Sequence, residues 1–346
     1  MAFKVTLKPS GHQFEVEAGA RILDAGIAAG YAMPYSCRAG TCSTCRGKIV
    51  EGKVDYGFTT PHYLTPEHRA AGLALLCSAS PLSDLVIEVE EVSSIGVKPT
   101  IIPCRIKSIE KVAPDVVVLS LKLPMNENMR FAAGQYVDFL LKDGKRRSYS
   151  IATAPGADGT VDIQLHIRHM PGGAFTDKLF DGSVKERDVM RFEAPLGTFF
   201  LREDSPKPIV MVASGTGFAP IKSMCEYAFR RGINTTRPIT VYWGCRVKSD
   251  LYMLELAEQW GREQPNVKFI PVLSDATATD AWAGRNGFVH RAVMEDFADM
   301  SGHQVYACGA PVMVDAARAD FVSKCGLPEA EFFADSFLSE ADKAPA

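Results

Sequence analysis

The sequence predicts a multidomain chain: a small α+β domain, then an antiparallel β-barrel, then a doubly wound parallel α/β domain. Three observations predict this class. The 346 residues are enough for two or three domains of ordinary size. Residues 102–204 contain strands with apolar and polar residues in alternation, together with turn signals. From residue 205 onward, short apolar strands alternate with helical patterns, which favours a parallel sheet with helices on both faces.

The composition is that of a folded globular protein, with 47% hydrophobic and 23% charged residues. The net charge of -3 argues against a dedicated nucleic-acid binder, which usually carries a basic excess. No apolar run reaches the ~18 residues that span a bilayer, and the N-terminal segment lacks the apolar core of a signal peptide. We therefore expect a soluble, cytoplasmic monomer that binds neither nucleic acid nor membrane.

The first domain is expected over 1–94, where short alternating strands surround one helical stretch at 21–29. Glycine and proline after Ser93 indicate a linker, which we place at 95–101. The barrel domain is expected over 102–204.

Two patterns within 102–204 support the barrel. Asp143-Gly144 lies between two strand-like runs and predicts a hairpin. The alternation over 161–168 predicts a strand with one wet face. Regular short strands of this kind favour a closed barrel.

The third domain is expected over 205–346. Its predicted strands and helices alternate along the chain: strands at 209–213, 239–243, 267–273 and 304–308, and helices at 219–231, 250–263, 290–299 and 311–324.

Four of the nine cysteines form a group with metal-ligand spacing, Cys37-x4-Cys42-x2-Cys45, with Cys77 32 positions further on. This is the plant-type [2Fe–2S] spacing. Small residues fill the gaps from Ala39 to Thr44, so that backbone N–H groups can approach a cluster. A structural zinc site and a redox-active Cys42–Cys45 disulfide are the alternatives. The other cysteines are expected to be small buried residues.

Residues 1–94, with this cysteine motif, resemble a plant-type ferredoxin of the β-grasp fold. Small side chains at Ala39–Ser43 lead us to expect that the cluster lies close to an exposed face there.

The barrel segment carries Arg147-Ser148-Tyr149-Ser150 at a strand end and, about 20 residues on, Gly172-Gly173 ahead of a short helix that includes Thr176. An arginine fork suits a phosphate, and a tyrosine offers a flat face for a ring. A glycine pair that opens a helix exposes N–H groups to a second phosphate. Each element alone is a weak signal, and an exposed strand end followed by a turn is the alternative.

The two elements in this order resemble the flavin domain of the ferredoxin–NADP reductase superfamily. The resemblance implies FAD, with Arg147 on a flavin phosphate, Tyr149 against the isoalloxazine and Ser150 at N5. It also implies pyrophosphate contacts from Gly172, Gly173 and Thr176. The remaining candidate cofactor-binding residues of this segment are Ser148, His166 and Arg168.

The third domain opens with a strand that runs into Gly215-Thr216-Gly217, followed by a helix with Pro220 in its first turn. Glycines let phosphates approach the backbone, and a helix N-terminus favours an anion. The stretch departs from Gly-x-Gly-x-x-Gly because Pro220 takes the place of the third glycine. Two further strands end at Arg246 and at Cys308-Gly309-Ala310-Pro311, and all these ends should meet at one sheet edge.

The superfamily resemblance implies that Gly215, Thr216 and Gly217 line a pyrophosphate and that Arg246 lies near the adenosine. It places Cys308, Gly309 and Pro311 beside the nicotinamide and Phe337 over the flavin. For Cys308 the alternative is a buried small residue, and for Phe337 the packing of a C-terminal strand. We expect NADH, because Asp250 would repel the 2′-phosphate of NADPH that Arg246 and Lys248 could bind; NADPH stays an alternative.

The whole chain resembles the reductase component of bacterial multicomponent oxygenases of the Rieske or di-iron type. The resemblance implies electron flow from NADH through FAD and the cluster to a terminal oxygenase of aromatic-ring or hydrocarbon metabolism, met transiently. Hydride transfer requires no acid or base, so we expect no catalytic residue beyond the cofactors, with Ser150, Cys308 and Phe337 nearby. The alternatives are a reductase for a CDP-sugar deoxygenating dehydrase, a free flavin or ferric reductase, and a redox sensor.

Overall fold

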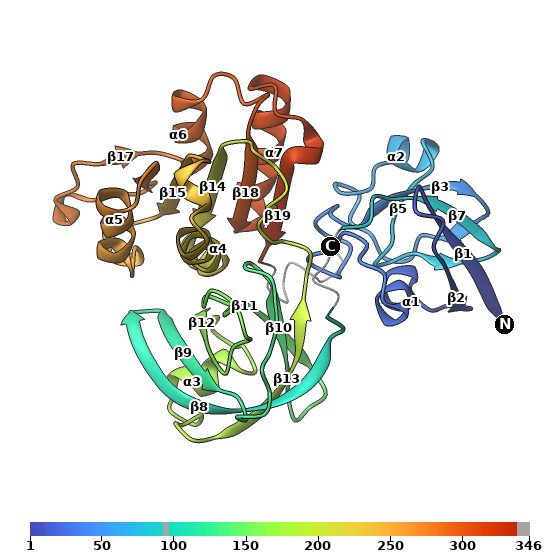
Figure 1. The fold of residues 1–346 in the computed structure, drawn as a ribbon, viewed down its shortest axis with the longest axis horizontal. Coiled ribbons are helices and arrows are strands. Elements are labelled where there is room, and N and C mark those ends of the chain that lie inside the picture. Colours follow the sequence, from blue (N-terminus) through green and yellow to red (C-terminus); the bar gives the residue numbers. More distant parts are fainter. Residues whose placement is uncertain (93–96, 338–346) are drawn as a thin grey trace. The chain divides into compact units, whose positions relative to one another are not determined.

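The computed structural model describes residues 1–92 and 97–337 (Figure 1). The chain forms two compact units. The first comprises Met1–Lys98 together with Gly197–Phe199, and the second comprises Pro99–Leu196 and Phe200–Phe337. Within the described residues, no helix is long and apolar enough to cross a membrane.

The first unit is built on a five-stranded sheet of order β2-β1-β7-β3-β5. Strands β1 and β7 are parallel, and the other pairs are antiparallel. Helix α1 buries Ile22 and Leu23 and ends where Gly30 adopts φ 95°. This mixed sheet with its helix confirms the predicted ferredoxin fold. The elements are β1 Ala2–Lys8, β2 Gln13–Glu17, α1 Ile22–Ala29, β3 Arg46–Glu51, β4 Val54–Asp55, α2 Pro66–Ala70, β5 Leu73–Leu75, β6 Ser80–Pro81 and β7 Leu85–Glu88.

The second unit begins with a six-stranded antiparallel sheet of order β11-β10-β13-β8-β9-β12. A bridge between Ile151 and Leu165 joins its two edges, as the predicted barrel requires. The Asp143-Gly144 hairpin forms between β10 and β11, with Gly144 at φ 79°. The elements are β8 Thr100–Ala113, β9 Val116–Lys122, β10 Tyr136–Leu140, β11 Arg146–Ser150, β12 Asp162–Arg168, α3 Thr176–Phe180 and β13 Val189–Leu196.

Strand β12 corrects one sequence prediction. We expected one of its faces to be wet, but His166 on that face is only 5% exposed. Its Nδ1 lies 2.9 Å from the hydroxyl of Tyr252, and the two rings meet edge to face. Tyr252 belongs to the nucleotide-domain half of the same unit, so a neighbouring domain covers this face at His166, whereas Asp162 on the same face stays partly exposed.

The unit continues with a six-stranded parallel sheet of order β17-β16-β15-β14-β18-β19. Strands β15 and β16 extend to one side of β14, whereas β18 and β19 extend to the other. The direction therefore reverses between β14 and β18, where ligands bind in open α/β sheets. The elements are β14 Ile209–Ser214, α4 Phe218–Arg231, β15 Ile239–Cys245, α5 Leu254–Glu263, β16 Val267–Leu273, β17 Arg285–Asn286, α6 Val289–Asp296, β18 Gln304–Gly309, α7 Pro311–Lys324 and β19 Phe332–Ser336.

Helices cover both faces of this sheet, which confirms the doubly wound class. Helices α6 and α7 share one apolar core with β14, β15 and β18. Helices α4 and α5 pack together on the other face, where the rings of Phe218 and Trp260 stack at 5.6 Å.

Candidate cofactor sites

The loop from Cys37 to Cys45 curls tightly in the first unit. Arg38, Gly40 and Ser43 all have positive φ, at 52°, 74° and 59°. Such a conformation is unusual for arginine and serine and is typical of functional loops. The backbone N–H of Ala39 points at the sulfur of Cys37 at 3.4 Å. The loop thus directs main-chain donors toward a thiol, as the small residues predict.

The four sequence-predicted thiols lie together. Hydrogen bonding with Cys37 and burial raise the pKa of Cys42 well above its usual value. For Cys77, a bond with Cys37 lowers the pKa, but a bond with Cys45 and burial outweigh it and raise the pKa to about 12. The crowded thiols hold their protons strongly, and a bound cation is what would stabilise their thiolates.

Two buried hydroxyls of this loop fit a bound group. Thr41 Oγ1 has no hydrogen-bond partner, and the Thr44 hydroxyl lies beside the Cys42 sulfur. Among the described residues, no three or more His, Cys, Asp or Glu side chains surround a single ion position. A two-iron cluster needs only two thiolates at each iron, which the neighbouring sulfurs can supply. The residues present therefore fit a [2Fe–2S] cluster.

The expected exposed face at Ala39–Ser43 is only partly present. Ala39 and Ser43 are half-buried, whereas Gly40, Thr41 and Cys42 are buried. The reason is the segment 57–59, whose backbone lies against Gly40. A Cβ at Gly40 would lie 2.8 Å from the carbonyl oxygen of Phe58.

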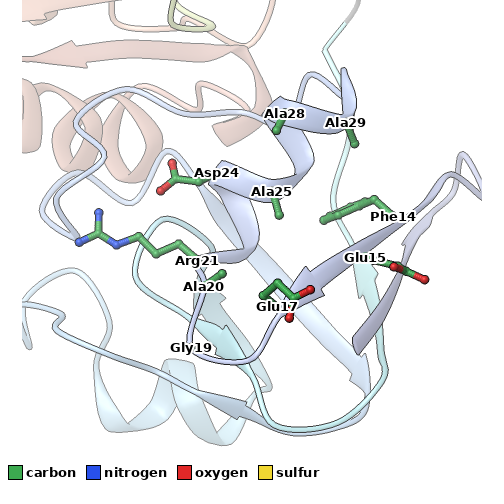
Figure 2. A pocket seen from close by; sticks show the side chains of 10 residues that line it. All are labelled: Phe14, Glu15, Glu17, Gly19, Ala20, Arg21, Asp24, Ala25, Ala28 and Ala29. Carbon is green, nitrogen blue, oxygen red and sulfur yellow. The ribbon is translucent and has the colours of Figure 1, made fainter. Parts of the chain in front are cut away.

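A shallow hollow of about 660 Å³ lies between β2 and α1 of the first unit (Figure 2). Small side chains such as Ala25 and Ala28 line it, with Glu15 and Asp24 among its acidic residues. None of the predicted cofactor residues belongs to it. Asp24 also bonds to Arg38 of the cysteine loop at 2.7 Å.

The predicted flavin strand is β11. Tyr149 packs with Phe139 and Phe175, with ring centroids 5.8 and 5.9 Å away. Burial raises the pKa of Tyr149, so its phenol stays neutral. Arg147 alternates onto the same side of the strand as Tyr149 and is half-buried, and its Nη1 donates to the carbonyl of Arg146 at 2.7 Å. On the other side, Ser148 Oγ donates to the buried Asp138.

Ser150 lies beside a carboxylate that the sequence analysis missed. Its Oγ is 3.5 Å from Oδ2 of Asp335 on β19, and both residues are buried. Burial and the Asp335 charge raise the pKa of Cys308 well above its usual value, so the thiol is neutral. Three strands thus bring Ser150, Cys308 and Asp335 together. The only sequence signal for Asp335 is its place at a strand end on the same sheet edge.

The N–H groups of the glycine pair, which were predicted to face a phosphate, have hydrogen-bond partners within the chain. Gly172 N donates to Asp177 Oδ2 at 3.0 Å, and Gly173 N donates to the carbonyl of Met170 at 2.8 Å. Thr176 Oγ1 bonds to both main-chain groups of Met170. The turn before α3 therefore satisfies its own donors.

Arg168 on β12 faces the glycine turn at 215–217, which the sequence predicts to bind a pyrophosphate. A Cβ on Gly215 would lie 3.4 Å from its guanidinium carbon. Its Nε is 3.4 Å from Asp115, but Nε and Nη2 are buried with no hydrogen-bond partner. A half-buried arginine with free N–H donors, next to a glycine turn and a helix N-terminus, fits a phosphate group even though Asp115 already balances part of its charge.

The carboxyl edge of the parallel sheet is closely packed at its centre. A Cβ on Gly217 would lie 2.2 Å from the carbonyl oxygen of Cys308. Gly309 has φ 134°, and its Cβ would lie 2.2 Å from Ser214 Oγ. That hydroxyl accepts a bond from Ala310 N at 2.9 Å. The glycines are therefore required for the ends of β14 and β18 to approach each other.

The remaining predicted residues of this edge lie near its centre. Pro220 is in the first turn of α4, and Pro311 begins α7. Phe337 directly follows β19, and its N–H donates to the carbonyl of Gly309 at 2.8 Å. Its ring is half-buried, so both strand packing and a site position remain consistent with it.

Helix α4 is hydrogen-bonded to the loop that follows β11. Ser223 Oγ donates to the carbonyl of Thr153 at 2.8 Å, and Lys222 Nζ reaches that of Ala152 at 3.4 Å. Arg230 Nη2 donates to Pro155 O at 3.0 Å. Helix α4, which follows the glycine turn at 215–217, is thus hydrogen-bonded to the loop directly after the strand that carries Arg147 and Ser150. Nothing local in the sequence indicates this contact.

Carboxylates surround the predicted adenosine end. Arg246 Nε lies 3.4 Å from Oδ2 of Asp250, which is largely buried. Asp280 accepts a bond from the N–H of Lys248 at 3.0 Å. Asp275 donates its own N–H to the carbonyl of Arg246 at 2.9 Å.

Comparison with known families matches all three parts of the chain. Residues 5–82 match the 2Fe-2S iron-sulfur cluster binding domain. Residues 103–201 match the oxidoreductase FAD-binding domain, and residues 211–319 the oxidoreductase NAD-binding domain. The chain is therefore an NAD(P)H-dependent flavin oxidoreductase with an iron–sulfur domain.

Relatives extend along the whole length. The CDP-6-deoxy-L-threo-D-glycero-4-hexulose-3-dehydrase reductase of Yersinia pseudotuberculosis is 41% identical over 98% of this chain and 99% of its own. The phenol 2-monooxygenase reductase component DmpP of a Pseudomonas species is 34% identical over 99% of this chain and 97% of its own.

A solved structure agrees with these relatives. The Amycolatopsis cytochrome P450 reductase GcoB is 33% identical, with a TM-score of 0.78, and the match covers 97% of this chain and 98% of that one. The chain belongs to the family of electron-transfer reductases that join a plant-type ferredoxin domain to FAD- and NAD-binding domains.

Proposed function

We propose that this reductase takes electrons from NADH and delivers them singly, through a cluster on Cys37, Cys42, Cys45 and Cys77, to a CDP-sugar dehydrase. The observation that carries the choice of acceptor is the 41% identity, over nearly the whole chain, to a reductase named for such a dehydrase. Relatives named for oxygenases are 34% identical over a similar length. This choice replaces the oxygenase that the sequence analysis favoured.

The thiol loop supports the role of the four cysteines as ligands. Its sulfurs adjoin one another, its Thr41 hydroxyl lacks a partner, its Thr44 hydroxyl lies beside Cys42, and Ala39 N–H points at Cys37. When bound, the cluster accepts one electron at a time, and the flavin exchanges either one or two electrons.

Arg147, Tyr149 and Ser150 are the residues we propose to hold FAD. The half-buried Arg147 provides a cation for phosphate, and the neutral Tyr149 provides a flat apolar ring that Phe139 and Phe175 fix in place. Arg168, beside Gly215, is proposed for the pyrophosphate of the dinucleotide at the turn. Because Gly172, Gly173 and Thr176 already have partners, any phosphate contact from them requires those bonds to be exchanged.

We infer NADH rather than NADPH from the adenosine end. Asp250 already forms an ion pair with Arg246, and Asp275 and Asp280 lie in the neighbouring turns. These carboxylates repel a 2′-phosphate and can accept bonds from ribose hydroxyls. The ratio of kcat/KM for NADH to that for NADPH should be large, and Asp250→Ala should lower it.

Ser150, Cys308 and Phe337 are proposed to border the reacting rings, with Asp335 beside Ser150. The neutral Cys308 thiol is no nucleophile in this setting. The chain's contribution is to position two rings and exclude water, so we assign no general acid or base.

The acceptor is tested with the purified full-length protein and NADH. The dehydrase, supplied with its CDP-sugar substrate, and the oxygenase component of a phenol 2-monooxygenase are offered separately. We expect NADH consumption coupled to the dehydrase to be the faster of the two. Coupling to the oxygenase alone would restore the original prediction, and cytochrome c reduction without coupling to either would refute both acceptors.

The domain boundaries at 94, 101 and 204, the monomeric state and the absence of nucleic-acid binding stay predictions.

A further inference from the structure

Phe58 is an exposed aromatic residue that lies directly beside the cysteine loop. Its side chain is 48% exposed. A Cβ on Gly40 would lie 2.8 Å from the carbonyl oxygen of Phe58, and a Cβ on Gly57 would lie 2.3 Å from that of Ser78. Gly40 lies between Cys37 and Cys42, and Ser78 follows Cys77. The turn at 57–58 therefore contacts both segments that carry the four thiols.

Neighbouring side chains hold this turn in place. Asp55 Oδ1 accepts a bond from Gly57 N at 3.0 Å, and Gly57 has φ 59°. The exposed Arg69 donates to Thr59 Oγ1 at 2.9 Å. Its guanidinium carbon lies 4.8 Å from the centroid of the Tyr56 ring. Phe58 is thus presented on an ordered turn, which lowers the entropy lost when a partner binds.

We propose that Phe58 and Arg69 form the docking contact for the protein that accepts electrons from the cluster, an inference that rests on the proposed function. The few residues that dominate binding energy at interfaces are enriched in aromatic side chains and arginine. Redox encounters bury little surface, so one such pair can dominate them. The partner is a redox protein with an apolar patch beside its own centre and a carboxylate opposite Arg69.

The electron balance is simple. Each encounter moves one electron from the reduced cluster to the acceptor, and no bond forms or breaks. One NADH supplies the electrons for two encounters and releases one proton.

The test compares Phe58→Ala with Phe288→Ala in the full-length holoprotein. Phe288 is a matched control, because it is 57% exposed and lies 5.4 Å from the guanidinium carbon of Arg291 in the nucleotide domain. Binding of the CDP-sugar dehydrase is measured by surface plasmon resonance, and cytochrome c reduction by its KM and kcat. Stopped-flow absorbance follows reduction of the cluster by NADH.

We expect Phe58→Ala to weaken dehydrase binding and raise the KM for cytochrome c by at least about fivefold, as loss of a dominant interface residue does. The cluster spectrum and the rate of cluster reduction should not change, and Phe58→Tyr should restore binding. Phe288→Ala should match the wild type.

Unchanged acceptor binding in Phe58→Ala would overturn the proposal. A slower reduction of the cluster by NADH would overturn it too, because the turn would then serve electron entry from the flavin. If Phe58→Ala lost its cluster, Arg69→Gln decides: weaker, less salt-dependent binding supports the proposal, and unchanged binding refutes it. A wild-type cluster that NADH does not reduce would instead refute the proposed function.

Discussion

The cysteine loop and the carboxyl edge of the parallel sheet, which are the proposed cluster and nucleotide sites, differ in the feature that defines their geometry. In the loop, the functional groups are side chains: four thiols that crowd one another, with a backbone curled around them at Arg38, Gly40 and Ser43. At the sheet edge, absent side chains matter most, because Gly217 and Gly309 leave no space for a Cβ. The first region should respond to a change of chemistry at constant size, and the second to an added methyl group.

The largest effect is expected from Cys42→Ser, which changes one sulfur to oxygen at almost constant volume. The cluster should be lost, while FAD in the other unit stays bound. Iron and acid-labile sulfide should fall from about two per chain toward zero, and cytochrome c reduction should fall with them. A variant that keeps its full sulfide content would show that cluster binding does not depend on this thiol. Cys104→Ser, outside the loop, is the control.

Arg147→Ala tests the proposed FAD site, where a single side-chain cation is expected to bind a phosphate. Loss of a charge-assisted bond costs about 1.5–3 kcal/mol, which corresponds to roughly 10- to 150-fold weaker FAD binding. Flavin content after gel filtration measures the change, with the exposed Arg191→Ala on β13 as a control. Equal flavin retention in both variants would contradict the assignment. Released FMN instead of FAD would contradict the cofactor.

Gly217→Ala tests the sheet edge by adding one methyl group. The new Cβ would meet the Cys308 carbonyl at 2.2 Å, and backbone cannot move aside cheaply. Overpacking of this kind costs about 1–3 kcal/mol, so the KM for NADH should rise by roughly 10-fold or more. Gly302→Ala is the control for volume, since nothing lies within 4 Å of its Cβ position and its φ is not in the left-handed region. The iron content should stay constant. An unchanged KM for NADH would show that the backbone at this edge can move apart to accept the added methyl group.

The smallest effect at neutral pH is expected from His166, a buried side chain near the sheet edge. Burial is the main cause that lowers its pKa from 6.5 to about 3. Its folded-state pKa is depressed, so the unfolded chain takes up a proton first as the pH falls. The free energy of unfolding should therefore decrease from pH 6.5 toward pH 3, with no contribution from this group above that window. Flavin fluorescence during urea unfolding measures it, and His166→Gln should have a shallower pH dependence. Identical slopes in the two proteins would remove His166 as the cause.

The same contrast explains what the sequence could predict. The grouping of the four thiols was predictable because three of them lie within nine positions in a recognisable spacing. The strands and helices of the parallel sheet were predictable because their hydrophobic patterns are local. Asp335 and Ser223 were not, since their partners are Ser150 and the Thr153 carbonyl, far away in sequence.

Two interactions were missed for a similar physical reason. The alternation in β12 cannot reveal that Tyr252 covers His166. The glycine pair before α3 likewise gives no sign that Asp177 and Met170 already accept its N–H groups. Local pattern predicts which groups a segment carries but not which other segment satisfies them.

The hydrogen bonds between α4 and the loop after β11 have a consequence for protein engineering. Ser223, Lys222 and Arg230 donate to main-chain carbonyls at 152–155 and make no demand on the side chains there. The side chains at 152–155 can therefore change without loss of these hydrogen bonds, provided that the backbone of this loop keeps its path. A chimeric reductase that takes its barrel from one relative and its nucleotide domain from another should therefore keep this junction when α4 carries the three donors.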